Sequence, residues 1–391
     1  SPKPCFRLKS PFPDLRRMNE ARGGFAASVV RWQREHGRHD LPWQQVADPY
    51  RVWLSEIMLQ QTQVSTVLKY YPPFLRRFPD LGSLAAADID DVLAAWSGLG
   101  YYSRARNLHR CAREVRDRFG GSWPKSAGML QTLPGIGRST AAAISSFCFG
   151  ERVAILDGNV RRVLARVLGF DLDLSNAANL RQLWALAEDL LPVERLPDHM
   201  PAYTQGLMDL GATVCSVRSP RCDACPVATQ CTANKSGRPE AFPVRTRKLT
   251  RRTESIWLLW AIRSDGSNWL VRRPEVGIWA GLYCLPAFPS LDSLEAAIYP
   301  QDLQAADFLP SISHALTHKD LVLHPVRLAA DSQEMEVGGA GLWVFPEKLT
   351  LLGLPAPIKK MLNSVRGSPG DFTDCAGHPV RDAASKSSRL V

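Results

Sequence analysis

The chain has 391 residues, and this length favours two or three domains over one. Hydrophobic residues make up 45% and charged residues 22%, as in globular proteins, and no apolar run is long enough to span a membrane. Lysine and arginine number 48 against 38 acidic residues. The resulting charge of +10 favours a polyanionic partner, although a basic protein without such a partner has the same balance.

The first half of the chain has the pattern of a helical domain. Residues 1–24 are rich in proline and basic side chains and hold no apolar signal core, so we expect a disordered segment in an intracellular protein. From residue 25 to residue 231, apolar residues recur at helical spacing between short turns. Asp48 followed by Pro49, for example, is a typical helix start. We therefore predict an all-α domain over 25–231.

A glycine-containing turn lies within this domain. Residues 133–137 read Leu-Pro-Gly-Ile-Gly and precede a small-residue helix expected over 139–149. Gly135 and Gly137 permit a tight turn and let backbone N–H groups approach an anion at a helix N-terminus, although plain helix–helix turns share this pattern. Further on, Asp157 follows an apolar stretch and precedes a glycine. We expect its carboxylate to be partly buried; the alternative is that Asp157 or Asn159 simply caps the next helix.

Four of the nine cysteines lie close together in the chain. They are Cys215, Cys222, Cys225 and Cys231. In a chain without an export signal, this clustering indicates a metal or metal–sulfur site rather than disulfides. One Cys-x-x-Cys pair with a wider gap on each side is more typical of a [4Fe-4S] cluster than of a zinc ribbon. We predict one [4Fe-4S] cluster, with a zinc site or four unrelated thiols as the alternatives.

The composition changes after residue 231. Basic residues, proline, serine and glycine dominate residues 232–253, which we predict to be an exposed linker. Strand patterns follow at 255–263, 269–272, 321–328 and 342–345, with a helix over 291–298. Residues 254–365 are therefore predicted to form an α+β domain of their own. Residues 366–391 are polar and rich in serine, and we expect a disordered tail.

Five segments of the helical half carry a family resemblance. They read LPWQ (41–44), WLSEIMLQQTQV (53–64), GLGYYSRARNLH (98–109), LPGIGRSTAAAI (133–144) and LDGNVRRVLAR (156–166). Together with the four cysteines they resemble the helix-hairpin-helix DNA glycosylases of the endonuclease III superfamily, and within it the adenine-specific, MutY-type branch. The resemblance implies a six-helix-barrel lobe over about 48–155, and a cluster lobe made of the N-terminal helix and residues 156–231.

The resemblance also implies a reaction. Such enzymes hydrolyse the N-glycosidic bond of adenine mispaired with 8-oxoguanine or guanine, after flipping the base out of duplex DNA. By this resemblance Glu56 protonates N7 of adenine and Asp157 faces C1′ of the sugar. Apolar neighbours of Glu56 are expected to raise its pKa. Ser139 and Asn159 are expected to support the water and Asp157.

Further roles follow from the same motifs. The residues implied to line the adenine pocket are Trp43, Leu59 and Gln205. The residues implied to contact DNA are Gln61, Tyr101, Gly135, Gly137 and Arg161, with a monovalent cation at the hairpin. Gln61 and Tyr101 would fill or wedge the base stack beside the opposing base.

Lysine usage indicates a monofunctional enzyme. Bifunctional members of the superfamily carry a lysine nucleophile where this chain has Ser139, and no lysine lies between Lys125 and Lys235. A Schiff-base lyase needs such an amine. Arg161 replaces a second family lysine and cannot form the imine. An endonuclease III-like lyase is therefore disfavoured, and a non-catalytic DNA-binding iron–sulfur protein is disfavoured by the carboxylates described above.

Residues 272–286, RRPEVGIWAGLYCLP, resemble the C-terminal domain of this family, which shares the Nudix fold. The clustered glutamates of Nudix hydrolases are missing, so recognition is a better interpretation than hydrolysis. Where the family reads 8-oxoguanine with Phe-Ser-His, this chain has Leu316, Thr317 and His318, which lose the aromatic ring. We expect a monomer bound to duplex DNA in the cytoplasm or nucleoid, without a membrane, and with the linker as a docking site for repair or clamp proteins.

Overall fold

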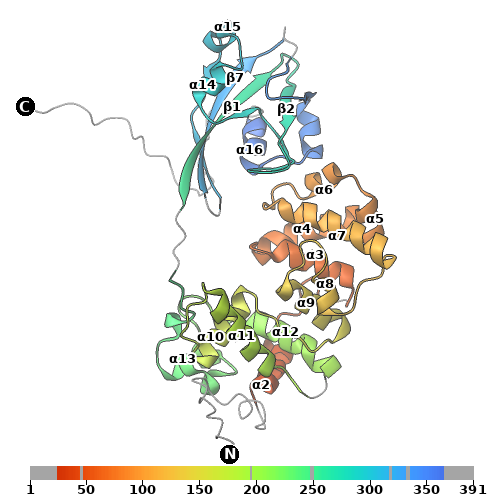
Figure 1. Ribbon diagram of the computed structural model, residues 1–391, viewed down its shortest axis with the longest axis vertical. Coiled ribbons are helices and arrows are strands. Elements are labelled where there is room, and N and C mark those ends of the chain that lie inside the picture. Colours follow the sequence, from red (N-terminus) through yellow and green to blue (C-terminus); the bar gives the residue numbers. More distant parts are fainter. Residues whose placement is uncertain are drawn as a thin grey trace, which may run out of the picture. The chain divides into compact units, whose positions relative to one another are not determined.

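The computed structural model describes residues 24–44, 47–193, 196–246, 251–316, 319–331 and 335–364. These residues form two compact units: one draws on 1–86 and 107–248, and the other on 87–106 and 249–391. Figure 1 labels their elements along the chain. The segments predicted to be disordered, 1–24 and 366–391, lie outside the described residues except for Gly24.

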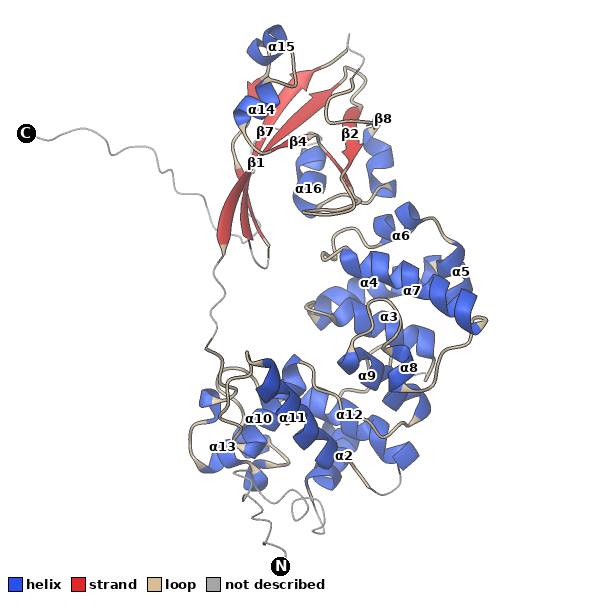
Figure 2. Cartoon of the chain, viewed as in Figure 1, coloured by secondary structure: helices blue, strands red, loops and turns tan. Residues whose placement is uncertain are grey.

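Helices make up the first part of the chain, shown in blue in Figure 2, which confirms the all-α prediction. They are α2 (Phe25–His36), α3 (Pro49–Leu59), α4 (Val64–Arg77), α5 (Leu81–Ala86), α6 (Ile89–Ala95), α7 (Ser103–Phe119), α8 (Ala127–Leu130), α9 (Arg138–Phe149), α10 (Gly158–Leu168), α11 (Ala177–Asp189), α12 (Leu196–Thr213) and α13 (Thr232–Lys235). Within the described residues, none of the helices combines the length and the apolar character needed to cross a membrane.

Helix α3 begins as its sequence predicts. The Asp48 side chain accepts a hydrogen bond from the Tyr50 N–H at 3.0 Å, and Pro49 occupies the first helical position. This cap satisfies a backbone donor that the helix itself leaves unpaired. Trp53 and Ile57 then bury one face of the helix. The cap and the buried face together fix where α3 presents Glu56.

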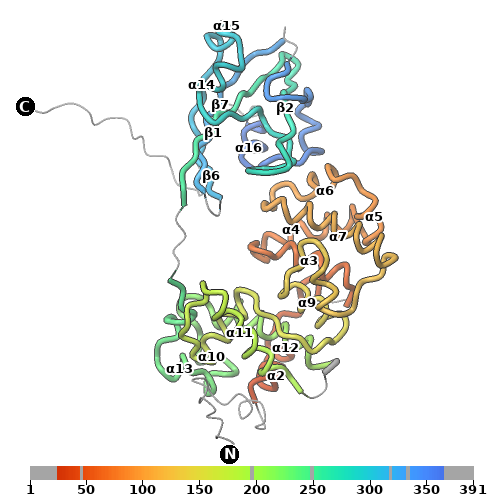
Figure 3. Tube along the Cα trace, viewed as in Figure 1, coloured from red at the N-terminus to blue at the C-terminus, as the bar shows by residue number. Residues whose placement is uncertain are grey.

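Helix α12 lies close against two other helices because of its glycines. It contacts α2 from the start of the chain (Figure 3) and α10. A Cβ at Gly206 would lie 2.8 Å from Val29 Cγ1 of α2, and a Cβ at Gly211 would lie 2.6 Å from Asn159 Cβ of α10. Contacts shorter than 3.0 Å are sterically forbidden, so the glycines allow this spacing. The N-terminus of α10 is thereby held against α12.

The predicted linker is wrong over its first half. Residues 232–235 form α13, and Ala233 is fully buried in the core shared with α10. Phe242 packs against the same core, and Val244 accepts a hydrogen bond from the Leu174 N–H at 3.1 Å. The composition of this segment resembles a linker, but contacts with distant parts of the chain hold it in the helical unit.

The boundaries of the helical unit also differ from the expected 25–231, because residues 87–106 group with the C-terminal residues. Tyr102 donates a hydrogen bond from its hydroxyl to Leu354 O at 2.7 Å. An Arg272–Asp90 ion pair spans 3.0 Å. A continuous helical pattern in the sequence carries no signal of such contacts.

The second unit contains a mixed sheet, which confirms the α+β prediction. Its strands are β1 (Arg252–Ile262), β2 (Asn268–Arg272), β3 (Tyr283–Cys284), β4 (Ala287–Phe288), β5 (Asp307–Phe308), β6 (Ile312–Ala315), β7 (Lys319–Ala329) and β8 (Gly341–Val344). The order is β3-β2-β1-β7-β5, with β4 beside β1, β6 beside β7 and β8 beside β2. The long strands β1 and β7 run parallel, and the other pairs are antiparallel.

Short helices cover both faces of this sheet. The face with Leu258, Trp260 and Leu323 packs against α16 (Ala356–Ser364). The face with Leu259 and Val326 packs against α14 (Leu291–Glu295) and α15 (Pro300–Gln304). Helix α14 ends three residues before the predicted 298. Each unit therefore has its own hydrophobic core.

Candidate active site

A cavity of about 330 Å³ lies in the helical unit between α3, the segment before it, and α12. Glu56 of α3 lines it, together with Trp43, Leu59 and Gln205, the three residues predicted to form the adenine pocket. These positions are scattered along the chain and come together only in the fold. Polar and apolar side chains share its lining, and a concave site with convergent polar groups is typical of a small-ligand site.

Glu56 is held as a neutral acid near physiological pH. Burial of its carboxyl group, together with the nearby negative charge of Asp157, raises its pKa to about 8. Desolvation disfavours the charged form of a carboxyl group, and a second carboxylate adds repulsion. At pH 7 the side chain therefore carries a proton that it can donate.

Asp157 has a different environment although it carries the same chemical group. It caps α10, accepting a hydrogen bond from the Val160 N–H at 2.7 Å, so its helix-capping role is confirmed. Burial raises its pKa above the ordinary aspartate value, while the backbone N–H groups of Val160 and Asn159 and the charges of Arg162 and Arg161 oppose that rise. These donors favour the anion. Of the two neighbouring acids, Glu56 therefore holds the proton.

The sequence interpretation did not identify Arg162, which anchors this end of α10. Its guanidinium donates to Asn159 Oδ1 at 2.9 Å, Gly211 O at 2.6 Å and Cys215 O at 2.8 Å. Asn159 therefore lies beside Asp157 with its side-chain oxygen already bonded. The only sequence signal for this role is the position of Arg162 one turn after Asn159, which places both on one helix face.

The predicted hairpin is a turn that leads into α9. Gly135 has a φ of +76°, and a Cβ there would lie 2.8 Å from Asn107 Cβ. Gly137 differs from expectation, because it caps α9 with a φ of −85° that other residues also adopt. It is exposed, and a Cβ there would meet open space, so the N-terminus of α9 is not covered on that side. Ser139 is half-buried in the first turn of that helix.

Backbone strain marks both residues predicted to enter the base stack. Gln61 has a φ of +55° and Tyr101 a φ of +50°, a region that residues other than glycine rarely adopt. Both side chains are exposed, and the Arg104 guanidinium lies 5.4 Å from the centre of the Tyr101 ring. Strained conformations of this kind cluster at functional sites. Arg161, the last predicted DNA contact, is half-buried at the start of α10.

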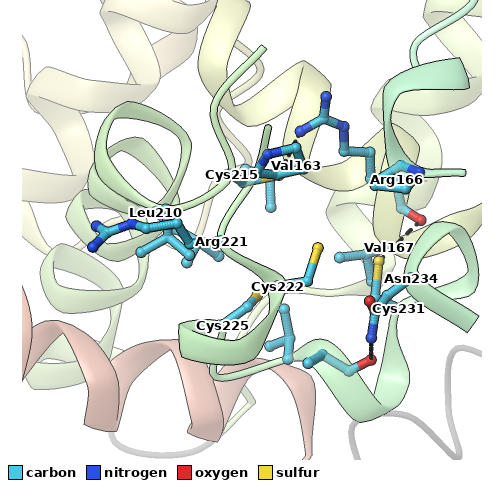
Figure 4. Close-up of a pocket in the computed structure, with 15 residues that line it drawn as sticks. Val163, Arg166, Val167, Leu210, Cys215, Arg221, Cys222, Cys225, Cys231 and Asn234 are labelled. Atoms are coloured by element: carbon cyan, nitrogen blue, oxygen red, sulfur yellow. Dashed lines mark hydrogen bonds between the residues drawn. The ribbon is translucent and has the colours of Figure 1, made fainter. Parts of the chain in front are cut away.

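Four cysteine thiols surround a second, smaller pocket (Figure 4). All four are free, and the buried guanidinium of Arg166 donates to Cys215 Sγ at 3.2 Å and to Ser216 O at 2.6 Å. Within the described ranges, no group of three or more His, Cys, Asp or Glu side chains is arranged to hold a single metal ion. Four thiols beside a cationic donor match the ligands of an iron–sulfur cluster.

The predicted recognition residues of the second unit are only partly described. Leu316 is half-buried at the turn after β6, and its N–H donates to Lys319 O at 2.7 Å. Thr317 and His318 lie outside the described residues. Of the other histidines nearby, His324 is stacked on Trp257 with ring centres 4.5 Å apart.

Comparison with known proteins identifies the families that the two parts of the chain match. Residues 54–188 match the HhH-GPD superfamily of base excision DNA repair proteins, and residues 258–364 match the NUDIX domain. Adenine DNA glycosylase from Buchnera aphidicola (subsp. Acyrthosiphon pisum) is 34% identical over 348 residues, which are 88% of this chain and 97% of that protein. The human adenine DNA glycosylase is 33% identical, over 93% of this chain and 78% of its own length.

The chain therefore belongs to the adenine DNA glycosylase family and is a hydrolase of N-glycosyl bonds. Among solved structures, a thermostable thymine-DNA glycosylase is 28% identical, with a TM-score of 0.47 over 54% of this chain and 95% of its own.

Proposed function

We propose that this enzyme excises adenine from mispairs with 8-oxoguanine or guanine in duplex DNA, with Glu56 as the proton donor and Asp157 as the anion beside the sugar. The observation that carries this proposal is the raised pKa of Glu56, about 8, at the edge of the cavity and beside Asp157. Two neighbouring carboxyl groups with different environments are typical of an acid and an anion that act on one glycosidic bond.

The proposed reaction balances on these two groups. Glu56 gives its proton to adenine N7, and the C1′–N9 bond breaks with its electron pair leaving on the base. The sugar becomes an oxocarbenium-like cation, which the Asp157 carboxylate stabilises or captures. Water then adds to C1′ and loses a proton to the ionised Glu56, which restores the starting state.

We infer that the enzyme is monofunctional. Ser139 occupies the position of the lyase nucleophile, and none of the described residues that line the cavity is a lysine. A hydroxyl group cannot form the imine that a lyase reaction needs. Water is therefore the acceptor of the sugar in this proposal.

We assign recognition of the opposing 8-oxoguanine to the second unit, through Leu316, Thr317 and His318, which lie between β6 and β7 in the sequence. The match of residues 258–364 to the NUDIX domain supports this role, because the C-terminal domain with which the family is implied to read 8-oxoguanine shares that fold. A hydroxyl group and an imidazole supply donors and acceptors for the base edge. Leu316 offers apolar contact in place of aromatic stacking.

We also assign a [4Fe-4S] cluster to Cys215, Cys222, Cys225 and Cys231. The four free thiols around one pocket and the Arg166 donor support this assignment. When bound, the cluster would tie the loop after α12 to α10 and hold its basic residues in place. Iron and sulfide contents of the purified chain measure it, and stoichiometric zinc would contradict it.

Single-turnover excision from duplexes that carry adenine opposite 8-oxoguanine tests the proposal, with wild type, Glu56→Gln and Asp157→Asn compared side by side. We expect each variant to lose at least a hundredfold in rate, as when a general acid or an electrostatic stabiliser is removed. Borohydride added to the same reaction should trap little covalent adduct. Excision retained by both variants would contradict the mechanism, and strong trapping would contradict monofunctionality.

A further inference from the structure

A buried carboxylate at the adenine pocket takes no part in the proposed chemistry. Asp209 of α12 is 0% exposed. Its Oδ2 accepts a hydrogen bond from the Arg38 backbone N–H at 2.9 Å, and its Oδ1 accepts one from Arg38 Nε at 2.7 Å. Oδ1 also accepts from Nε2 of Gln205, one turn earlier on α12, at 2.8 Å. A buried carboxylate is tolerated only when it is paired in this way.

This contact determines which way the Gln205 amide points. A carboxylate paired with a guanidinium accepts hydrogen bonds and donates none, so the Gln205 atom that faces Asp209 is the NH₂ group. The amide oxygen lies on the opposite side of the same carbon. Gln205 lines the cavity, and among the described residues nothing donates to its Oε1. The oxygen is therefore the atom that Gln205 offers to a bound base.

Among the polar groups that line the cavity, two then have defined roles toward a bound base. Protonated Glu56 donates, and Gln205 Oε1 accepts. Along its exposed edge, adenine carries the N7 acceptor and the N6 amino donor, whereas a 6-oxopurine carries two acceptors. A base with oxygen at position 6 would place the lone pairs of that oxygen against Gln205 Oε1. Neither of these two oxygens would then have a hydrogen-bond donor, which is costly in a desolvated site.

We propose that Asp209 is a positioning residue that fixes the Gln205 amide with its oxygen toward the base, so that the pocket accepts 6-aminopurines and rejects 6-oxopurines. Arg38 is also part of this arrangement. It holds Asp209 through its backbone and its side chain, and it lies shortly before Trp43, so the same contacts hold the pocket wall. The inference rests on the proposed function and adds the source of base selectivity.

The test compares single-turnover excision of adenine and of hypoxanthine, its 6-oxo analogue, both opposite guanine. In Asp209→Asn the new amide can accept or donate, so Gln205 is free to turn its NH₂ group toward the base. We expect the adenine-to-hypoxanthine rate ratio to fall about tenfold, as for one hydrogen bond and its reversal. Gln205→Leu should lower the ratio by a similar factor, and Asp209→Asn added to Gln205→Leu should not lower it further.

A matched control is Asp171→Asn, an exposed aspartate for which we expect unchanged rates on both bases. If Asp209→Asn slows both bases equally, Asp209 supports the fold alone and the proposal is wrong. Should that variant fail to fold, Gln205→Leu decides, because an unchanged ratio in it would also overturn the proposal. Failure of the proposed mechanism is a separate result, since it appears as retained excision by Glu56→Gln.

Discussion

At the scale of single residues, Glu56 and Asp157 show how position gives one chemical group two roles. Both are partly withdrawn from water, and burial raises the pKa of each. Asp157 also faces backbone N–H groups and two arginines, which stabilise the anion. For Glu56, burial and the charge of Asp157 both raise the pKa, which reaches about 8. This difference in pKa places the proton on Glu56 and leaves Asp157 as the anion.

This assignment predicts the pH dependence of excision. Glu56 must be protonated, so the rate should fall as the pH rises through about 8. Asp157 must be ionised, so the rate should also fall at acidic pH, beginning above the ordinary aspartate value because its pKa is raised. In Glu56→Gln the residual rate should lose its alkaline decline. Single-turnover rates at several pH values measure this, with the exposed Glu35→Gln as control; a wild-type rate that is flat through pH 8 would contradict it.

The strained Tyr101 gives a second prediction. Tyr101→Gly relieves the positive φ but removes the ring that is predicted to wedge the stack. We expect the free energy of unfolding to change by less than about 1 kcal/mol, because relief of strain offsets the lost contact with Arg104. Excision from a duplex mispair should slow about tenfold or more, since stacking on an aromatic ring contributes about 1–3 kcal/mol.

The control substrate for Tyr101→Gly is an adenine opposite an abasic position, where little stacking must be broken. Its excision should be affected less than that of the paired adenine. Equal slowing on both substrates would argue against a wedge and for a general loss of DNA binding.

At the scale of elements, α10 connects the candidate catalytic centre to the cysteine loop. Its N-terminus carries Asp157 as the cap, and Arg162 in the next turn bonds the carbonyl groups of Gly211 and Cys215. Arg166, a turn further, donates to the Cys215 thiol. The position of Asp157 therefore depends on how closely α12 approaches α10, and Gly211 sets that distance.

Gly211→Ala tests this dependence. The added methyl group would lie 2.6 Å from Asn159 Cβ, so the helices must separate. We expect a loss of about 1–3 kcal/mol in the free energy of unfolding, as for overpacked sites, and a slower excision rate because Asp157 moves. Denaturant unfolding and single-turnover kinetics measure both. Gly128→Ala in α8 is the matched control, because its added methyl meets open space and should leave the rate unchanged.

At the scale of the whole molecule, two units with separate cores divide the recognition of one base pair in our proposal. In that proposal, the cavity of the helical unit takes the adenine, and residues 316–318 of the sheet unit contact 8-oxoguanine. Damage to one unit should therefore alter one half of the recognition and leave the other intact.

His318→Ala provides that test in the full chain. We expect the preference for adenine opposite 8-oxoguanine over adenine opposite guanine to fall about five- to tenfold, the effect of one lost hydrogen bond. Excision opposite guanine should change little. His324→Ala serves as the matched control, since that ring is stacked on Trp257 within the sheet. A preference that is unchanged by His318→Ala would move the recognition site elsewhere.

Local patterns in the sequence were sufficient for much of this description. The Asp48–Pro49 start of α3, the strand pattern of β1 and the spacing of the four cysteines depend on neighbouring residues and general chemistry, so they can be read without coordinates. The family motifs added Glu56 and Asp157. Propensity, capping and alternation all act within a few residues, which is why these predictions needed no tertiary information.

Contacts between distant residues were decided only in three dimensions. Composition placed residues 232–253 in a linker, yet Ala233 and Phe242 pack into the helical core. The Arg38–Asp209 pair joins side chains 171 positions apart, and no local pattern connects them. The pKa values of Glu56 and Asp157 likewise depend on burial and on charges brought from other helices. The sequence by itself determined the elements and the chemical groups; the packing decided which groups meet, because desolvation and charge act through space and not along the chain.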